Sequence, residues 1–245
     1  PVQMKEIRAR EALKGLPPKR LIDTGYGVIE HLRTAYEQME QVPHDRPQIL
    51  IAPSWQKDNI LDSCIDPLLR QLLAEDRYNV IVRPHPEWIK RFPQKQEAFE
   101  QRHQAELAAG KFEFQTDFSS GDTVYQSDLV ITDWSSIAME FSFTTCKPSL
   151  FINTPMKVMN PNYRELNLEP LDLSLRDQLG RSVELDAVGS TAGQAVADLL
   201  ADAEGYRERI GKLVCELMPN FGHSGEIGGK YILRSLQEKI QKRKD

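Results

Sequence analysis

Short apolar runs separated by longer helical patterns dominate the chain from residue 48 to residue 153. The runs are "QILIAP", "NVIVRP", "FEFQT", "DLVIT" and "SLFIN", which begin at residues 48, 79, 112, 128 and 149. Strands rich in Val, Ile and Leu without polar alternation are typical of a sheet that is buried on both faces. Strands that alternate with helices predict right-handed crossovers and a parallel sheet. The pattern therefore predicts an α/β, Rossmann-like doubly wound domain over residues 48–245.

Helical patterns fill the spaces between these runs and close the chain. The expected helices are residues 59–76, 87–110, 135–145, 190–204, 206–218 and 224–241. Residues 1–47 are also helical in tendency, but "GLPPKR" and "DTGYG" interrupt them. Within them, residues 28–39 predict an amphipathic helix with Ile29, Leu32 and Tyr36 on one face. We expect residues 1–47 to be a helical appendage or linker ahead of the Rossmann-like domain.

Composition and charge narrow the class of protein. With 40% hydrophobic and 27% charged residues, the chain has the composition of an ordinary globular protein. Its formal net charge of −5 opposes general nucleic-acid binding, which usually needs a basic face. Both ends are locally basic, however, in "KEIRAR" and "QEKIQKRKD". Solvated helix ends are the first interpretation, and attraction to an anionic membrane surface is the second.

Targeting and redox signals are sparse. No apolar run approaches the roughly 18 residues of a membrane-spanning helix, and "PVQMKEIRAR" lacks the apolar core of a secretory signal. The chain begins with proline, which is typical of a piece of a longer protein. Cys64, Cys146 and Cys215 have neither disulfide nor zinc spacing, and we expect no metal and no cofactor. A cytoplasmic location is expected, with peripheral attachment to the inner face of the cell membrane as the second interpretation.

Ligands of doubly wound sheets bind beyond the carboxyl ends of the strands, where the strand order reverses. "PSWQKDN" follows the first strand, and Ser54 with its neighbouring amides lies where the next helix begins. Unpaired amides at a helix start favour phosphate, but Ser54 or Asp58 could equally be a plain N-cap. Neither GxGxxG nor GxxxxGK(S/T) is present, so the chain has no dinucleotide fingerprint and no P-loop.

"RPHPEW" follows the second strand and holds a histidine between two prolines. Pro84 and Pro86 fix φ on either side of His85, which predicts a rigid imidazole at the sheet edge. A histidine there can bind phosphate when it is charged, or carry a proton near neutral pH. Arg83 beside it could clamp a phosphate through two hydrogen bonds. A purely structural histidine is the alternative.

"TDWSS" follows the fourth strand, and "IAMEFSF" continues as a helix. Asp133 is expected to cap helix amides, while Ser135 and Ser136 present hydroxyls at the positive end of the helix dipole. Glu140 lies one turn beyond Ser136 on the same face, where a carboxylate commonly accepts hydrogen bonds from a ribose. Capping and phosphate binding are compatible here.

Taken in order, "ILIAPSW", "RPHP", "SDLVITDWSS", "MEF" and "KPSLFIN" resemble the CDP-glycerol glycerophosphotransferase family of teichoic-acid and capsule synthesis. The resemblance covers roughly residues 20–240. It implies that the chain is mostly the C-terminal, donor-binding half of a GT-B architecture, with the appendage coming from the acceptor-side domain. It also implies transfer of glycerol phosphate from CDP-glycerol to a glycan or lipid-linked acceptor hydroxyl, with release of CMP.

By this resemblance, His85 is the catalytic residue and holds the pyrophosphate together with Ser135 and Ser136. Glu140 would bind the ribose, and Ser54 and Trp55 would line the donor pocket. Arg83 and Asp133 complete the expected substrate-binding set.

The motifs depart from the family at several positions. Gln56 stands where the family usually has arginine, so one phosphate contact is either missing or moved to Lys57 or Arg83. Trp134 replaces tyrosine, and Glu140 replaces aspartate. The acceptor half, which supplies a second histidine expected to be the base, lies outside this chain, so the chain alone should bind donor but catalyse poorly.

Two other functions fit the same motifs. One is a GT-B glycosyltransferase that uses a UDP- or CMP-sugar in capsule synthesis, since the same sheet-edge chemistry would serve. The other is a non-catalytic nucleotide-binding domain, which the missing acceptor half and Gln56 favour.

Overall fold

The computed structural model describes residues 2–243, and it confirms the parallel, doubly wound sheet. The sheet has six strands in the order β3-β2-β1-β4-β5-β6, and all neighbouring pairs are parallel. The strands are β1 (Gln48–Ile51), β2 (Asn79–Val82), β3 (Glu113–Phe114), β4 (Leu129–Thr132), β5 (Ser149–Asn153) and β6 (Gly180–Glu184).

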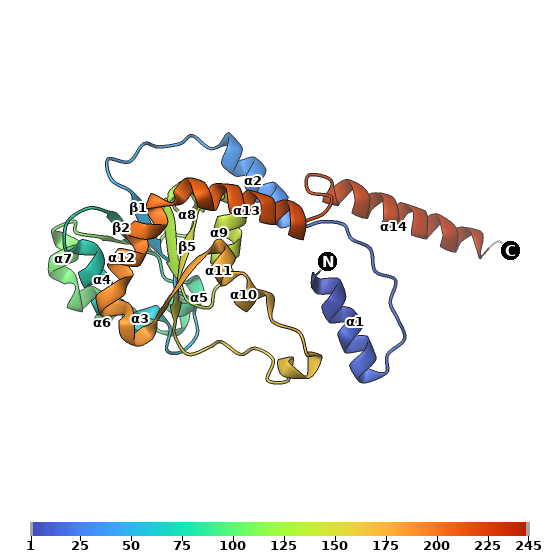
Figure 1. Ribbon diagram of the computed structural model, residues 1–245, viewed down its shortest axis with the longest axis horizontal. Helices are drawn as coiled ribbons and strands as arrows, with labels where there is room; N and C mark the ends of the chain where they lie inside the picture. The colour runs from blue at the N-terminus through green and yellow to red at the C-terminus, as the bar shows by residue number, and fades with distance from the viewer. Residues whose placement is uncertain (1, 244–245) are drawn as a thin grey trace.

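Helices cover both faces of this sheet (Figure 1). They are α1 (Val2–Lys14), α2 (Gly27–Gln38), α3 (Ile60–Ser63), α4 (Ile65–Leu73), α5 (Pro86–Arg91), α6 (Pro93–Arg102), α7 (Gln104–Ala108), α8 (Asp122–Gln126), α9 (Ile137–Thr145), α10 (Leu171–Ser174), α11 (Arg176–Leu179), α12 (Val188–Ala201), α13 (Ala203–Leu217) and α14 (Ser224–Gln241), with 3-10 turns η1 (Tyr163–Leu166) and η2 (Leu185–Ala187). The helix expected at residues 87–110 is three short helices, because Pro93 starts a new helix and His103 ends it.

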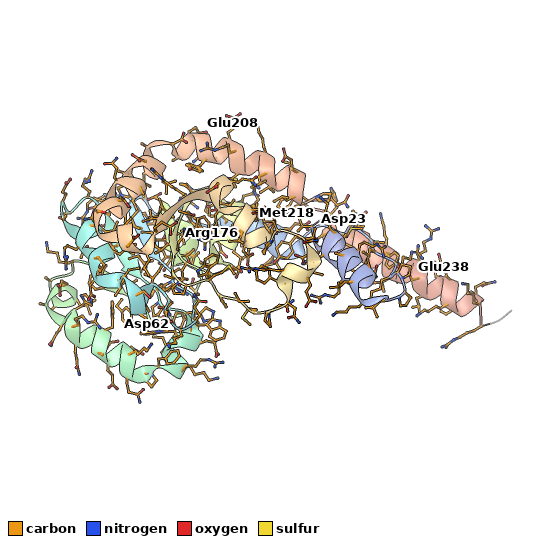
Figure 2. All side chains as sticks on the ribbon, turned by 60° about the horizontal axis from the view of Figure 1, so that its bottom comes forward. Asp23, Asp62, Arg176, Glu208, Met218 and Glu238 are labelled. Carbon is orange, nitrogen blue, oxygen red and sulfur yellow. The ribbon has the colours of Figure 1, made fainter. Side chains whose placement is uncertain are left out.

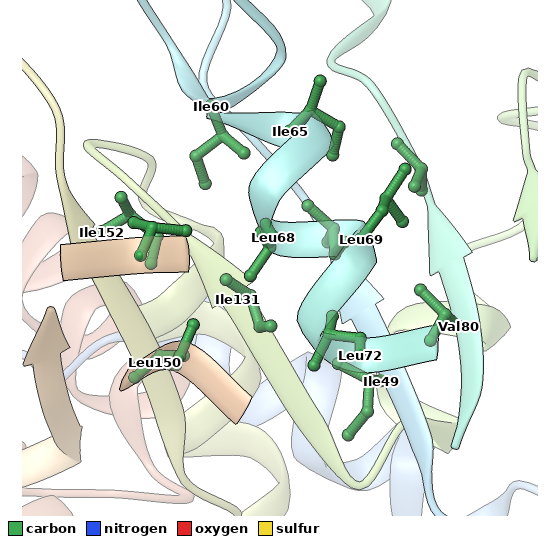
Figure 3. Close-up of a cluster of buried hydrophobic side chains, with 14 of the residues drawn as sticks. Ile49, Ile60, Ile65, Leu68, Leu69, Leu72, Val80, Ile131, Leu150 and Ile152 are labelled. Atoms are coloured by element: carbon green, nitrogen blue, oxygen red, sulfur yellow. The ribbon is translucent and has the colours of Figure 1, made fainter. Parts of the chain in front are cut away.

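Alternate residues of the central strands face opposite layers. Ile49 and Ile51 of β1 point into the larger core, which α4 and α12 cover, whereas Leu50 points into a smaller core with Phe141 of α9. Figure 3 shows the larger core as a continuous set of Ile and Leu side chains between α4 and the strands. These strands are therefore buried on both faces, which explains their apolar composition.

The pattern of apolar runs does not predict the edge strand β6. Its segment "GRSVE" has one buried apolar side chain, that of Val183, and three polar residues, Arg181, Ser182 and Glu184. A Cβ at Gly180 would lie 1.6 Å from the carbonyl oxygen of Ser149, so only glycine fits where β6 approaches β5. The strand is specified by this close approach and not by an apolar run.

The terminal segments differ in how they pack. The amphipathic helix expected at residues 28–39 is α2, and its Ile29 is 1% exposed in a cluster with Phe143. Helix α14 instead extends away from the sheet (Figure 1). Among residues 2–243, no helix is both long and apolar enough to cross a membrane. The predicted boundary at residue 47 stays a prediction.

The strand order sets the position of the candidate site. The chain proceeds from β1 outward to β2 and β3, then returns to place β4 on the other side of β1. The order therefore reverses between β1 and β4, and the crevice beyond their carboxyl ends is where doubly wound sheets bind ligands. "PSW" and "DWSS" follow these two strands.

Candidate functional site

The loops after β1 and β4 are joined by a buried carboxylate. Asp133 is 1% exposed, and its Oδ1 accepts a hydrogen bond of 2.7 Å from the backbone N–H of Ser54. Its Oδ2 accepts a second bond, of 3.4 Å, from the hydroxyl of Thr154 after β5. The expected capping of helix amides by Asp133 is wrong, because both oxygens bind neighbouring loops. Asp133 positions the site, and its contact with a ligand stays a prediction.

Ser54 is buried directly after β1, and its hydroxyl is unused. It is 1% exposed, and its Oγ has no hydrogen-bond partner among the described residues. The N-cap of α3 is Asn59, whose side chain accepts from the N–H groups of Leu61 and Asp62. The interpretation of Ser54 or Asp58 as a plain N-cap is therefore wrong. A buried polar atom without a partner is unusual and is explained where a ligand or water binds it.

The first turn of α9 presents a serine and a glutamate together. The hydroxyl of Ser136 donates to Oε1 of Glu140 at 2.9 Å, which confirms that the two share one helix face. The hydroxyl of Ser135 accepts a long bond, 3.4 Å, from the N–H of Ile137. Ser136 is exposed, while Ser135 and Glu140 are half-buried. These groups are bonded only within their own turn, so a ligand can reach them.

His85 is held rigidly at the end of β2, as the flanking prolines predict. It is the N-cap of α5, and its Nδ1 accepts a 3.0 Å bond from the N–H of Glu87. The proton of the neutral ring is therefore assigned to Nε2. Burial lowers the pKa of His85 below its ordinary value, and the charge of Lys157 lowers it further, against the opposing effect of Glu87. At neutral pH His85 is a neutral donor and not a cation.

The guanidinium of Arg83 is already engaged. Its Nη1 donates to Oε1 of Gln115 at 2.8 Å, and its Nη2 donates to the carbonyl oxygen of Ser120 at 2.8 Å. Its Cζ also lies 5.3 Å from the ring centroid of Phe118. Arg83 thus braces the loop after β3. A phosphate clamp by this residue stays a prediction, and it would have to replace or share these bonds.

Arg176 is a residue of the site that the sequence pattern did not indicate. It is 6% exposed and donates to the carbonyl oxygen of Asp133 at 2.6 Å and to Oδ1 of Asn153 at 2.7 Å. Its Cζ lies 3.8 Å from the ring centroid of Trp134, and burial lowers its pKa to about 10. Figure 2 shows Arg176 within the body of the molecule, and it lies 43 residues beyond Asp133 in the chain. Arg176 locks the turn that carries "DW".

Trp55 forms a second aromatic contact at the same edge. The ring is half-buried, with Cζ of Arg91 at 4.9 Å and Nζ of Lys157 at 5.0 Å from its centroid. Lys157 belongs to the loop after β5 and was not predicted as a site residue. No sequence signal marks it, because the segment "TPMKVMNP" has no strand-end motif of its own.

A pocket of about 320 Å³ opens beside the first turn of α9. Ser136 and Glu140 are polar residues of its wall, which also includes Met139, Ile22 and Met218. The volume is that of a small-molecule pocket, and mostly apolar walls with few polar groups are usual for such sites. Ser54, Asp133, His85 and Trp55 follow strands at the same carboxyl edge of the sheet, but they do not line this pocket.

A comparison with models of protein families identifies the family of this chain. Residues 18–160 match the model of CDP-Glycerol:Poly(glycerophosphate) glycerophosphotransferase. The chain belongs to this family. The match contains the strand-end motifs from "PSW" to "DWSS", and it confirms the resemblance found in the sequence. A search of curated proteins found no match.

Solved structures of similar fold are GT-B glycosyltransferases. An α,α-trehalose-phosphate synthase (UDP-forming) from Burkholderia vietnamiensis is 10% identical with a TM-score of 0.50, and the similarity covers 98% of this chain and 50% of that one. An α,α-trehalose 6-phosphate synthase from Burkholderia multivorans is 10% identical with a TM-score of 0.53, over 87% of this chain and 50% of that one. This family member therefore spans about half the length of those structures and shares the fold of one half.

Proposed function

We propose that this chain is the donor-binding part of a transferase that moves glycerol phosphate from CDP-glycerol to an acceptor hydroxyl. Membership of the glycerophosphotransferase family supports the reaction class. The observation that carries the proposal is the buried, unpartnered Ser54 hydroxyl, at the point where the loops after β1 and β4 are bonded to each other. Such an atom is accounted for by a ligand with polar oxygens, and the switch-point crevice is where nucleotides bind.

Each residue would bind a different part of the donor. Ser54, Ser135 and Ser136 would donate hydrogen bonds to the diphosphate, and Nε2–H of His85 would donate another without adding charge. Glu140 would accept from the ribose hydroxyls, which requires Ser136 to turn from Glu140 to a phosphate oxygen. Trp55 would form the wall on the β1 side. Asp133 and Arg176 would hold the loops after β1 and β4 in place around the donor.

The reaction is a phosphoryl transfer in which positioning and charge neutralisation provide most of the catalysis. The acceptor oxygen attacks the β-phosphorus of CDP-glycerol and forms a new P–O bond. The bond from that phosphorus to the bridging oxygen breaks, and CMP leaves with the electron pair. The acceptor proton passes to a base, which we place in the acceptor half outside this chain. The acceptor is a glycan or lipid-linked hydroxyl.

Calorimetry with nucleotides tests the proposal directly. CDP and CDP-glycerol should bind with a dissociation constant on the order of micromolar. His85→Ala should weaken CDP roughly ten- to a hundredfold, because it removes a hydrogen bond to a charged group. His31→Ala, on an exposed face of α2, is the matched control. A folded chain that binds no cytidine nucleotide would contradict the proposal.

A glycosyltransferase that uses a UDP- or CMP-sugar is the second candidate. The GT-B fold of the trehalose-phosphate synthases favours it. Thermal-shift ranking of CDP-glycerol, CDP-ribitol, UDP-sugars and CMP-sialate separates the two, since the ligand that binds most tightly raises the melting temperature most at equal concentration.

A further inference from the structure

Lys157 is a cation beside the site that forms no ion pair within residues 2–243. It is half-buried, and its Nζ lies 5.0 Å from the ring centroid of Trp55. An ammonium group over an aromatic face is partly desolvated, so it gains from an additional anionic partner. The contact with Trp55 alone leaves its three donors without an acceptor.

The loop that carries Lys157 is fastened to the other strand-end loops. Nε2 of Gln56 donates to the carbonyl oxygen of Pro155 at 2.9 Å, and Nε1 of Trp134 donates to the carbonyl oxygen of Thr154 at 2.8 Å. The loop after β5 is therefore bound to the loops after β1 and β4. These bonds place Lys157 at the carboxyl edge of the sheet and limit how far it can move.

Lys157 and His85 share one electrostatic environment. The charge of Lys157 is, after burial, a cause of the lowered pKa of His85. The positive charge of Lys157 and the N–H donor of neutral His85 together form a favourable setting for an anion, and Glu87 is the acid that acts on His85. Glu87 itself is engaged by Arg91, whose Nε lies 2.8 Å from its Oε2.

The other basic side chains near the site are less available. Arg91 is paired with Glu87, and Arg83 donates to Gln115 and Ser120. Lys57 is exposed, so water competes with any phosphate for its ammonium group. Of these four basic residues, Lys157 is the one that is partly buried, lies in a loop bonded to its neighbours and has free N–H donors.

We infer that Lys157 binds the diphosphate of the donor and supplies the positive charge that neutralises it beside His85. The inference rests on the proposed function for the identity of the ligand. It assigns the contact to the loop after β5, and not to Lys57 or Arg83. An ammonium group is a compact point charge suited to phosphate oxygens.

The test is calorimetry of the whole chain with CDP and with inorganic pyrophosphate. Lys157→Met should weaken both ligands roughly ten- to a hundredfold, as expected for loss of a charged hydrogen bond. Lys157→Arg should restore most of the affinity, because it keeps the charge. Lys90→Met, an exposed lysine on α5, is the matched control and should leave both affinities unchanged. NMR titration of Lys157→Met should show a raised pKa of His85.

The outcomes separate this inference from the proposed function. Normal binding of both ligands by Lys157→Met, or loss of binding in Lys57→Met in its place, overturns the inference and leaves the function standing. Pyrophosphate binding that depends on Lys157, without any cytidine-nucleotide binding, overturns the proposed function and supports the charge assigned here. A wild-type chain that binds neither ligand overturns both. A weakened affinity that Lys157→Arg does not restore also overturns the inference, since packing and not charge would be the cause.

Discussion

The two halves of "DWSS" lie next to each other in the chain but have opposite surroundings. Asp133 is buried and bonded to Ser54 and Thr154, and Trp134 is stacked on Arg176. Ser136 is exposed and bonded only to Glu140, one turn away. The polar groups of the first half are bonded to other loops, whereas the Ser136 hydroxyl is bonded only within its own turn. A rigid support directly followed by open polar groups is how a binding site is kept in shape before the ligand arrives.

The buried half of "DWSS" should therefore affect the stability of the fold, and the open half should affect ligand binding. Substitutions in the buried half should lower the free energy of unfolding, because each leaves a buried polar group without its partner. Substitutions in the open half should leave that free energy almost unchanged and act on ligand affinity. A variant of the open half that lowers stability, or a variant of the buried half that leaves it unchanged, would contradict this difference.

The largest expected effect is on stability in Arg176→Met. The substitution removes the bonds to Asp133 and Asn153, and we expect a loss of about 3 kcal/mol in the free energy of unfolding. Urea denaturation measures it. Arg181→Met, which removes an exposed arginine paired with Asp198, is the matched control and should unfold like the wild type. Equal stability of the two variants would contradict the supporting role of Arg176.

Glu140→Ala should show the reverse pattern. We expect about tenfold weaker CDP binding, because a ribose acceptor is lost, with the urea midpoint unchanged. Inorganic pyrophosphate, which has no ribose, should bind as before. A similar loss for both ligands would mean that Glu140 acts on the diphosphate and not on the sugar.

Ser54→Ala tests whether the unpartnered hydroxyl has a ligand role. Removing a buried hydroxyl without a hydrogen bond should not destabilise the fold, and it could stabilise it by up to about 1 kcal/mol. CDP affinity should fall severalfold in the same variant. Asn59→Ala should instead lower the free energy of unfolding, because Asn59 caps α3 and its Nδ2 donates to the carbonyl oxygens of Ser54 and Gln56 at 2.9 Å. Loss of stability without loss of affinity in Ser54→Ala would identify a structural hydroxyl.

The smallest effect concerns pH. The pKa of His85 in the folded chain lies below its ordinary value of 6.5, so the unfolded chain binds the proton more tightly. The contribution of His85 to stability is therefore complete above pH 6.5 and is lost as the pH falls through 6.5 toward the folded pKa. Urea denaturation between pH 7.5 and 5 should show this loss in the wild type and less of it in His85→Gln. An NMR midpoint at or above 6.5 for the His85 ring would contradict it.

Much of the fold could be predicted because it depends on local composition. The runs at β1, β2, β4 and β5 are apolar on both faces since helices cover both sides of the sheet, and this pattern is visible in the sequence. The strand β6 could not be predicted in the same way. It is an edge strand with one buried apolar side chain, and its position follows from the close approach of Gly180 to Ser149.

The sequence by itself determined which polar groups come to the switch point. Each motif directly follows a strand, and parallel strands bring their carboxyl ends to one edge, so Ser54 and Ser136 lie at the switch point and His85 lies beside it on the next loop. It also determined the rigidity of His85, because a flanking proline fixes φ within the chain itself.

Only the tertiary structure decided what each of these groups can do. Asp133 bonds to Ser54 and Thr154 and not to its own helix, and Arg176 supports it from 43 residues further along the chain. Lys157 reaches Trp55 from the loop after β5. Burial, hydrogen-bond partners and local potential depend on which side chains meet in space, and contacts between distant segments leave no pattern along the chain.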